Sequence, residues 1–167
     1  LWPKASYIKL IKSILKKHTN KILLIGGSDD FSYNQNIIEE VNSAKVLNIA
    51  GNYSISDSIV YFRHAKLYIG NDGGPMHISA LSNIPIIGLF SFKDEAGIWD
   101  PIISDNYVSI RTDVSCKVCK QFTCDNNICL KYISVENVLN FVDSFLRAEN
   151  HKIQIINSSA SSIFSKN

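Results

Sequence analysis

The sequence predicts an α/β domain in which a parallel sheet carries helices on both faces, as in a Rossmann-like fold. Short continuous apolar runs, such as 21–25 and 86–90, are typical of parallel strands because both faces of such strands are buried. Between these runs lie segments whose apolar residues recur at helical spacing, so strands and helices alternate along the chain. The 167 residues fall in the range of one domain.

The first part of the chain is expected to contain three helices and two strands. Ser6 is a good cap for the first helix, which ends where Lys16, Lys17 and His18 suit the negative end of the helix dipole. Ser54, with Asp57 three residues later, resembles a capping box and opens a helix that ends near residue 64. The elements between them are a strand at 21–25, a turn at 26–30, a helix at about 32–42 and a strand at 46–49.

The second part of the chain contains the most regular strand-helix-strand unit. Ser134 is expected to cap a final helix with a continuous apolar stripe. Residues 150–167 are rich in Ser, Asn and Lys and show no periodicity, so we expect a domain at 1–149 and a flexible tail at 150–167. The preceding elements are strands at 67–70 and 86–90, a turn at 71–74, a helix at 75–82 and a further strand at 108–110.

Composition excludes several classes of protein. The 17 Lys and Arg residues nearly balance the 15 Asp and Glu residues and are spread along the chain, so there is no electrostatic case for nucleic-acid binding. No apolar run approaches the length of a membrane span. The start of the sequence lacks a signal peptide and an initiator Met, so we expect a cytoplasmic fragment. A weakly basic face is compatible with peripheral contact with the inner membrane.

The segment 70–77 is the most informative turn, because it leaves a predicted strand and enters a predicted helix. Gly73 and Gly74 permit positive φ angles and allow a ligand to approach the main chain, and Pro75 suits a first helical turn. The amides of this turn and the positive end of the helix dipole are expected to face a phosphate group.

Two side chains of the same turn have candidate roles. His77 is placed to donate a hydrogen bond to a phosphate oxygen, and Asp72 to brace the loop or accept a hydrogen bond from a ribose or sugar hydroxyl. The alternative is purely structural: the turn is then only a connection, Asp72 a cap and His77 a partly buried residue. Glycine-rich turns between a strand and a helix are a weak signal by themselves.

The four cysteines lie in one loop, 114–130, and permit three interpretations. Cys116, Cys119, Cys124 and Cys129 can bind a structural zinc ion, which would order a loop too polar to fold alone. Four free thiols and two short-range disulfides are the alternatives. No His with a nearby carboxylate is placed by the sequence to activate a catalytic thiol.

The loop after the strand at 86–90 also lies on the expected binding edge. Lys93, Asp94 and Glu95 are candidate contacts to a sugar or diphosphate, with a solvated loop as the alternative. For Trp99-Asp100-Pro101, a loop anchor is favoured over a wall of the binding pocket.

Several of these segments together resemble one enzyme family. The run from Asn71 to Ala80, followed by Pro85, 88–90 and 99–101, is similar to glycosyltransferase family 9, the ADP-heptose:lipopolysaccharide heptosyltransferases. Other segments also fall in the family's order: Trp2-Pro3, Gly26-Gly27, the run from Asn48 to Gly51, the cysteine cluster with Leu130, and the final amphipathic helix. The resemblance covers about residues 2 to 146 and corresponds to the C-terminal half of such an enzyme.

The resemblance implies a two-domain GT-B architecture. This half would bind the nucleotide-sugar donor, of the ADP-heptose type, while an N-terminal half would bind the lipopolysaccharide core acceptor and supply the catalytic carboxylate. Catalysis would be inverting and would require no metal, and this half alone would be inactive. By the same resemblance, Asp72, Gly73, Gly74 and His77 would hold the diphosphate and sugar, Asn52 and Tyr53 would border the adenosine, and Asp29 or Asp30 would lie near the ribose.

Two departures from the family pattern weaken the analogy. The family usually has Ser or Thr where this chain has Gly73, and its phosphate-binding Lys lies just before the Trp-Pro pair, outside this sequence. Two other classes of function therefore stay open: a different nucleotide-sugar enzyme on a similar scaffold, such as an N-acetylhexosamine transferase, and a non-catalytic binding domain stabilised by zinc.

Overall fold

The computed structural model describes residues 1–101, 106–116, 118–121 and 124–147. Within these ranges, the bounds of every predicted strand agree with the structure to within one residue at each end. The domain boundary at 149 and the tail at 150–167 lie outside the described residues.

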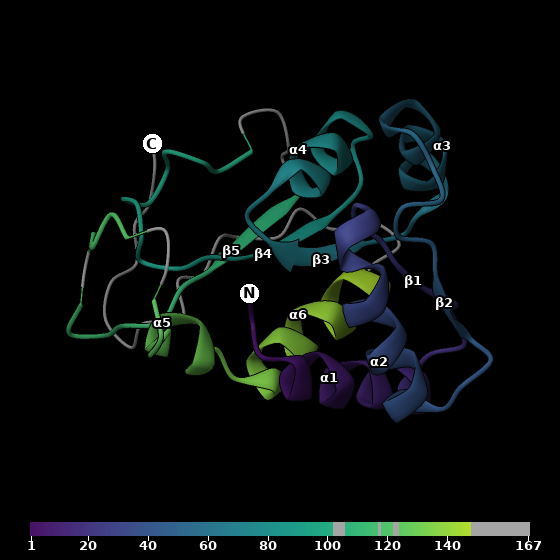
Figure 1. The fold of residues 1–167 in the computed structure, drawn as a ribbon, viewed down its shortest axis with the longest axis horizontal. Helices are drawn as coiled ribbons and strands as arrows, with labels where there is room; N and C mark the ends of the chain where they lie inside the picture. Colours follow the sequence, from purple (N-terminus) through teal and green to yellow (C-terminus); the bar gives the residue numbers. More distant parts are fainter. Residues whose placement is uncertain (102–105, 117, 122–123, 148–167) are drawn as a thin grey trace.

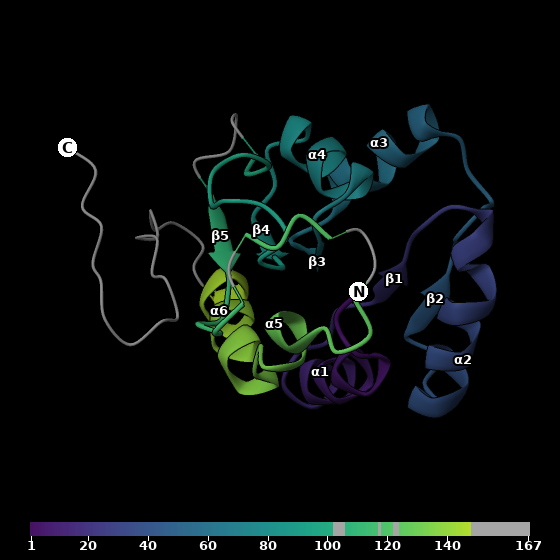
Figure 2. The ribbon, with the colours of Figure 1, turned by 60° about the vertical axis from the view of Figure 1, so that its left-hand side comes forward.

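All strand pairs in the structure are parallel, as predicted. They form two sheets instead of the single sheet expected: β1 pairs with β2, and β4 lies between β3 and β5. β1 lies beside β3 in the two ribbon views (Figures 1 and 2), where side chains such as Ile22 and Ile69 pack against the same buried cluster. The strands are β1 (Ile22–Leu24), β2 (Val46–Asn48), β3 (Tyr68–Asn71), β4 (Ile86–Leu89) and β5 (Tyr107–Ile110).

Helices cover both faces of the three-stranded sheet, which confirms the α/β class. In Figure 2, α3 and α4 lie on one side of the strands, and α1, α5 and α6 lie on the other. The side chains of β4 alternate accordingly, since Ile87 and Leu89 belong to the core beneath α1 and α6, and Ile86 packs beneath α4. The helices are α1 (Lys4–Lys17), α2 (Phe31–Val41), α3 (Ile55–His64), α4 (Gly74–Leu81), α5 (Ile128–Lys131) and α6 (Val135–Arg147), with a 3-10 turn η1 (Ser28–Asp30).

α4 packs closely against the sheet because a strand residue beneath it is a glycine. Gly70 and Gly88 are partners in the register of β3 and β4. A Cβ atom on Gly88 would lie 2.6 Å from the ring of Phe90 and 3.2 Å from the sulfur of Met76. Met76, in the first turn of α4, is fully buried in this space. Gly88 therefore leaves room for Met76 and lets α4 lie close to the sheet.

Most of the predicted helix caps are confirmed. Ser54 Oγ accepts a hydrogen bond from the Asp57 amide at 3.2 Å and Asp57 Oδ2 accepts one from the Ser54 amide at 3.1 Å, which forms the capping box. Ser134 Oγ accepts from the Asn137 amide at 3.0 Å. The prediction of Ser6 as a cap is wrong, because α1 already begins at Lys4. The preceding carbonyl, that of Pro3, accepts the amide hydrogen of Ser6.

Candidate functional site

The bend between β3 and α4 comprises residues 71–77 and lies at the carboxyl end of the strands. Its first residue, Asn71, is held by three hydrogen bonds. Asn71 Oδ1 accepts from the Trp2 amide at 2.8 Å and from the Tyr7 hydroxyl at 3.0 Å, and its Nδ2 donates to the Leu89 carbonyl at 2.9 Å. The bend is therefore fixed to the N-terminal segment and to β4 before it turns. The sequence had given no role to Asn71.

The two glycines of the bend keep its main chain accessible. Gly73 has φ 164°, which is extended backbone, and Gly74 is not among the glycines with positive φ, so neither uses the left-handed conformation that glycine permits. A Cβ on Gly74 would meet nothing within 4 Å, and one on Gly73 would make only an ordinary contact with Pro75. Asp72 and Gly74 are exposed. A ligand can therefore reach the backbone directly.

Fewer amides face outward than the sequence suggested. Pro75 has no N–H, and the Met76 amide donates to the Gly73 carbonyl at 3.0 Å. The His77 amide points at the same carbonyl over 3.5 Å. The amides of Gly73 and Gly74 remain at the open end of α4, where the helix dipole is positive.

Asp72 and His77 face each other across the bend. His77 Nε2 lies 3.6 Å from Asp72 Oδ1, and the two side chains are 44% and 36% exposed. Burial raises the pKa of Asp72, the nearby His77 and Arg111 lower it, and the charge of Asp94 raises it. Charged side chains of two other segments, Arg111 after β5 and Asp94 after β4, therefore influence the charge of the bend.

Arg111 has this influence although the sequence analysis did not identify it. It follows β5 directly and its side chain is only 8% exposed. Nη1 donates to the Ser91 carbonyl at 3.0 Å, Nη2 donates to Asp100 Oδ1 at 3.2 Å, and the guanidinium lies 4.2 Å from the centre of the Phe90 ring. Its position after a predicted parallel strand, at the binding edge, was the signal that could have found it.

The loop 91–100 follows β4 and contains the three charged candidates of the sequence. Asp94 accepts a hydrogen bond from Trp99 Nε1 at 3.1 Å, and the Lys93 carbonyl accepts one from the Lys120 amide at 3.0 Å. Glu95 is exposed. The segment Trp99-Asp100-Pro101 is anchored by Asp100, which accepts a hydrogen bond from Arg111. Trp99 is 50% exposed and is therefore not the anchor.

The ends of β1 and β2 form a second group. The Gly51 amide donates to the Gly26 carbonyl at 3.1 Å, and Gly51 combines φ 70° with a close approach to Ser28, so the two loops are in contact. Asp30 Oδ2 accepts from the Gly27 amide at 2.9 Å, which gives that carboxylate a local structural role.

The predicted nucleotide-contacting residues of this second group lie on the surface. Asp29, Asn52 and Tyr53 are exposed. The Tyr53 ring packs edge-to-face on Tyr61, with ring centres 4.7 Å apart. The bend, the loop 91–100 and Arg111 therefore follow three neighbouring parallel strands at one edge of the sheet, and the loops after β1 and β2 contact each other.

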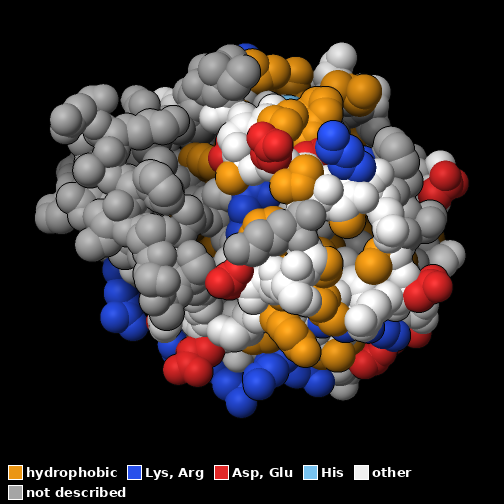
Figure 3. All heavy atoms as spheres, turned by 90° about the vertical axis from the view of Figure 1, so that its left-hand side faces the viewer, with side chains coloured by type: hydrophobic (Ala, Val, Ile, Leu, Met, Phe, Trp, Pro, Cys, Tyr) orange, Lys and Arg blue, Asp and Glu red, His pale blue; other side chains and the backbone are white. Residues whose placement is uncertain are grey.

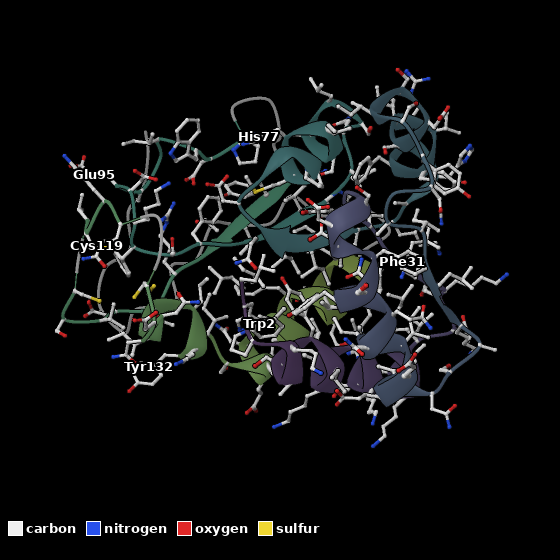
Figure 4. The ribbon with its side chains drawn as sticks, viewed as in Figure 1. Trp2, Phe31, His77, Glu95, Cys119 and Tyr132 are labelled. Carbon is white, nitrogen blue, oxygen red and sulfur yellow. The ribbon has the colours of Figure 1, made fainter. Side chains whose placement is uncertain are left out.

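The cysteine loop runs along the loop 91–100. The Cys119 amide donates to the Phe92 carbonyl at 3.2 Å, and Figure 4 shows Cys119 and Glu95 at the same end of the molecule. All four cysteines are free; Cys129 is buried and the other three are exposed. Within the described part of the chain, no three His, Cys, Asp or Glu side chains gather closely enough to hold a metal ion. The structure thus does not form the zinc site, which stays a prediction.

No helix among the described residues is long and apolar enough to cross a membrane.

Sequence comparison identifies a family and several relatives. The sequence model of glycosyltransferase family 9 (heptosyltransferase) matches residues 1–129. Lipooligosaccharide heptosyltransferase 2 of Campylobacter jejuni is 25% identical over 150 residues, which are 87% of this chain and 46% of the relative. Lipopolysaccharide heptosyltransferase 3 of Escherichia coli is 29% identical over 101 residues, 60% of this chain and 29% of the relative. The chain thus spans less than half the length of these relatives.

Solved structures confirm the fold. ADP-heptose lps heptosyltransferase II of Escherichia coli aligns with a TM-score of 0.71 and 21% identity, over 87% of this chain and 41% of that one. Heptosyltransferase WaaC of Escherichia coli, solved with ADP, aligns with a TM-score of 0.67 and 18% identity, over 86% of this chain and 39% of that one.

Proposed function

The chain belongs to glycosyltransferase family 9, and from this we propose that it is the donor-binding half of an inverting glycosyltransferase of lipopolysaccharide core assembly. The observation that carries the proposal is the open bend at 71–77, whose glycine main chain is accessible and whose flanking side chains are Asp72 and His77. Parallel α/β sheets bind ligands outside the carboxyl ends of their strands, and the bend lies there.

The donor is proposed to be a nucleoside diphosphate sugar of the ADP-heptose type. The amides of Gly73 and Gly74, the positive end of the α4 dipole and the His77 side chain favour the diphosphate. Asp72 is an acceptor for a sugar hydroxyl. Asn52 and Tyr53 would border the adenosine, and Asp29 the ribose, while Asp30 already caps the local turn.

In the proposed reaction, an acceptor hydroxyl oxygen forms a bond to the anomeric carbon as the bond from that carbon to the diphosphate oxygen breaks. The electron pair of the broken bond leaves with ADP, and the acceptor proton passes to a carboxylate supplied by a partner domain. Preorganised amides and His77 stabilise the charge that develops on the leaving diphosphate, which requires no metal. This chain alone is therefore expected to bind donor without transferring sugar.

Calorimetry with ADP, UDP and GDP tests the proposal. ADP is expected to bind, and His77→Ala to weaken it about tenfold through loss of a charge-assisted hydrogen bond. His64→Ala is the matched control, because His64 is also exposed but ends α3. Absence of binding by all three nucleotides, or equal affinity of the two variants, would contradict the proposal. Preference for UDP or GDP would assign a different donor.

A further inference from the structure

One tryptophan is exposed at the strand ends while the other is buried. Trp99 is 50% exposed, whereas Trp2 is completely covered. Figure 3 faces the end of the molecule that carries Glu95 and Cys119, and hydrophobic side chains are exposed there among acidic and basic ones. A large aromatic side chain gains by burial, and Trp99 leaves half of its surface exposed beside the candidate site.

A tight turn places Trp99 against Asp94. The Ile98 amide points at the Glu95 carbonyl over 3.5 Å, and Gly97, the third residue of this turn, has φ 93°. Positive φ at the third position is typical of a type II turn and favours glycine. The turn reverses the direction of the chain and brings Trp99 back to Asp94, where Trp99 Nε1 donates a hydrogen bond to Asp94 Oδ2 at 3.1 Å. This hydrogen bond orients both the indole ring and the carboxylate.

The loop that carries the pair is held by hydrogen bonds near both of its ends. Arg111 bonds the Ser91 carbonyl at one end and the Asp100 carboxylate at the other. The cysteine loop adds hydrogen bonds to the carbonyls of Phe92 and Lys93. Trp99 and Asp94 are therefore presented on a fixed loop, which lowers the entropy that a ligand would lose in ordering them.

The pair lies on the loop that follows β4, and the bend follows β3, the neighbouring parallel strand, in which Asn71 is the register partner of Leu89. The two segments therefore leave the same edge of the sheet next to each other, and the negative charge of Asp94 raises the pKa of Asp72. Two carboxylates and an exposed aromatic face are thus placed around the position where the sugar of a bound nucleotide sugar is expected.

We infer that Trp99 and Asp94 form a subsite for a pyranose ring. This inference rests on the proposed function, because it assigns the sugar to a place next to the diphosphate. The indole face would cover the apolar C–H face of the sugar, and Asp94, acceptor-only when ionised, would accept hydrogen bonds from its hydroxyls. The ring belongs either to the sugar of the donor or to a saccharide of the acceptor, and both present the same chemistry.

Iodide quenching of tryptophan fluorescence tests the subsite, because the other tryptophan is buried and emission that iodide can reach comes from Trp99. The complete chain is titrated with ADP, with ADP-glucose, and with a core oligosaccharide released from lipopolysaccharide. Protection by ADP-glucose beyond that by ADP assigns the subsite to the donor sugar. Protection by the oligosaccharide alone assigns it to the acceptor.

Variants provide the second readout. Trp99→Ala is expected to lower the affinity for the protecting sugar ligand about tenfold and to leave the affinity for ADP unchanged, with partial recovery in Trp99→Phe. Asp94→Asn is expected to lower the same affinity without removing the aromatic face. Tyr132→Ala is the matched control, since Tyr132 is an exposed aromatic residue at the end of α5.

The outcomes separate this inference from the proposed function. Failure of ADP, UDP and GDP all to bind overturns both. Normal ADP binding, with no protection of Trp99 by either sugar ligand and unchanged sugar affinity in Trp99→Ala, overturns the subsite and leaves the proposed function standing.

Discussion

His77 Nε2 lies 3.6 Å from Asp72 Oδ1 across the first turn of α4, and both side chains are accessible to solvent. The pair combines an acceptor for a sugar hydroxyl with a donor for a phosphate oxygen, at a main-chain bend left open by two glycines. This combination, rather than a glycine-rich turn alone, supports a nucleotide-sugar ligand.

Asp72→Asn is expected to raise the free energy of unfolding at neutral pH while weakening binding of an ADP-sugar. Burial raises the pKa of Asp72, so folding disfavours its charged form. The stability that the raised pKa gives is present at low pH and is lost as the pH rises through the folded pKa. At neutral pH the ionised carboxylate therefore lowers the free energy of unfolding. Urea unfolding at several pH values measures the effect, and a less stable variant at neutral pH would contradict it.

Gly88→Ala is expected to destabilise the domain by about 1–3 kcal/mol, because overpacking displaces the ring of Phe90 or the helix α4. Its added Cβ would lie 2.6 Å from that ring. Gly74→Ala is the control, since nothing lies within 4 Å of the added atom, and its stability is expected to stay within about 0.5 kcal/mol of wild type. Denaturant unfolding compares the two, and equal stabilities would refute the packing argument.

Asp143 is expected to make the domain sensitive to acid. Its carboxylate accepts hydrogen bonds from Lys17 Nζ at 2.7 Å and His18 Nε2 at 2.8 Å, which join α6 to the end of α1. The Lys17 contact, then the His18 contact, lowers the pKa of Asp143. Because the folded pKa lies below the unfolded one, this stability is present above the unfolded pKa of about 4 and is lost as the pH falls through the folded value.

The matching variant is Asp143→Asn, which should cost about 1 kcal/mol at neutral pH and flatten the acid limb of the stability curve. Glu40→Gln, which removes the carboxylate of the exposed pair with Lys4, should leave the stability and its acid limb unchanged. An unchanged acid limb in Asp143→Asn would show that the contact does not stabilise the native state.

The reactivity of the four thiols is expected to follow their exposure to solvent. Cys116, Cys119 and Cys124 should react rapidly with a thiol reagent, and buried Cys129 only on unfolding. Elemental analysis of protein purified without chelator distinguishes the zinc alternative: one equivalent of zinc with protected thiols would mean that the loop rearranges around a metal.

Local signals in the sequence predicted most of the fold. The Ser54 capping box and the cap at Ser134 depend on residues three positions apart, and the apolar strands depend on short runs, so both are visible without tertiary contacts. The cap at Ser6 failed because Pro3 starts the helix earlier. The short helix α5 carries too few residues for a periodic signal.

The sequence predicted contacts within the candidate site only where one segment carries them. Asp72 and His77 are close in sequence, so their proximity followed from the turn. Asn71 contacts Trp2, which is 69 positions away, and Arg111 contacts Ser91, which is 20 positions away. No local pattern reveals these partners, although the place of Arg111 directly after a predicted strand indicates the binding edge.

NMR titration of the complete chain with an ADP-sugar tests the central claim most directly. Bound diphosphate is expected to shift the amide signals of Asp72, Gly73, Gly74, Met76 and His77 more than those of the buried strand β4, because the negative charge lies at the open end of α4. If saturating ADP-sugar leaves these signals unmoved, the bend is a structural connection and not a donor site.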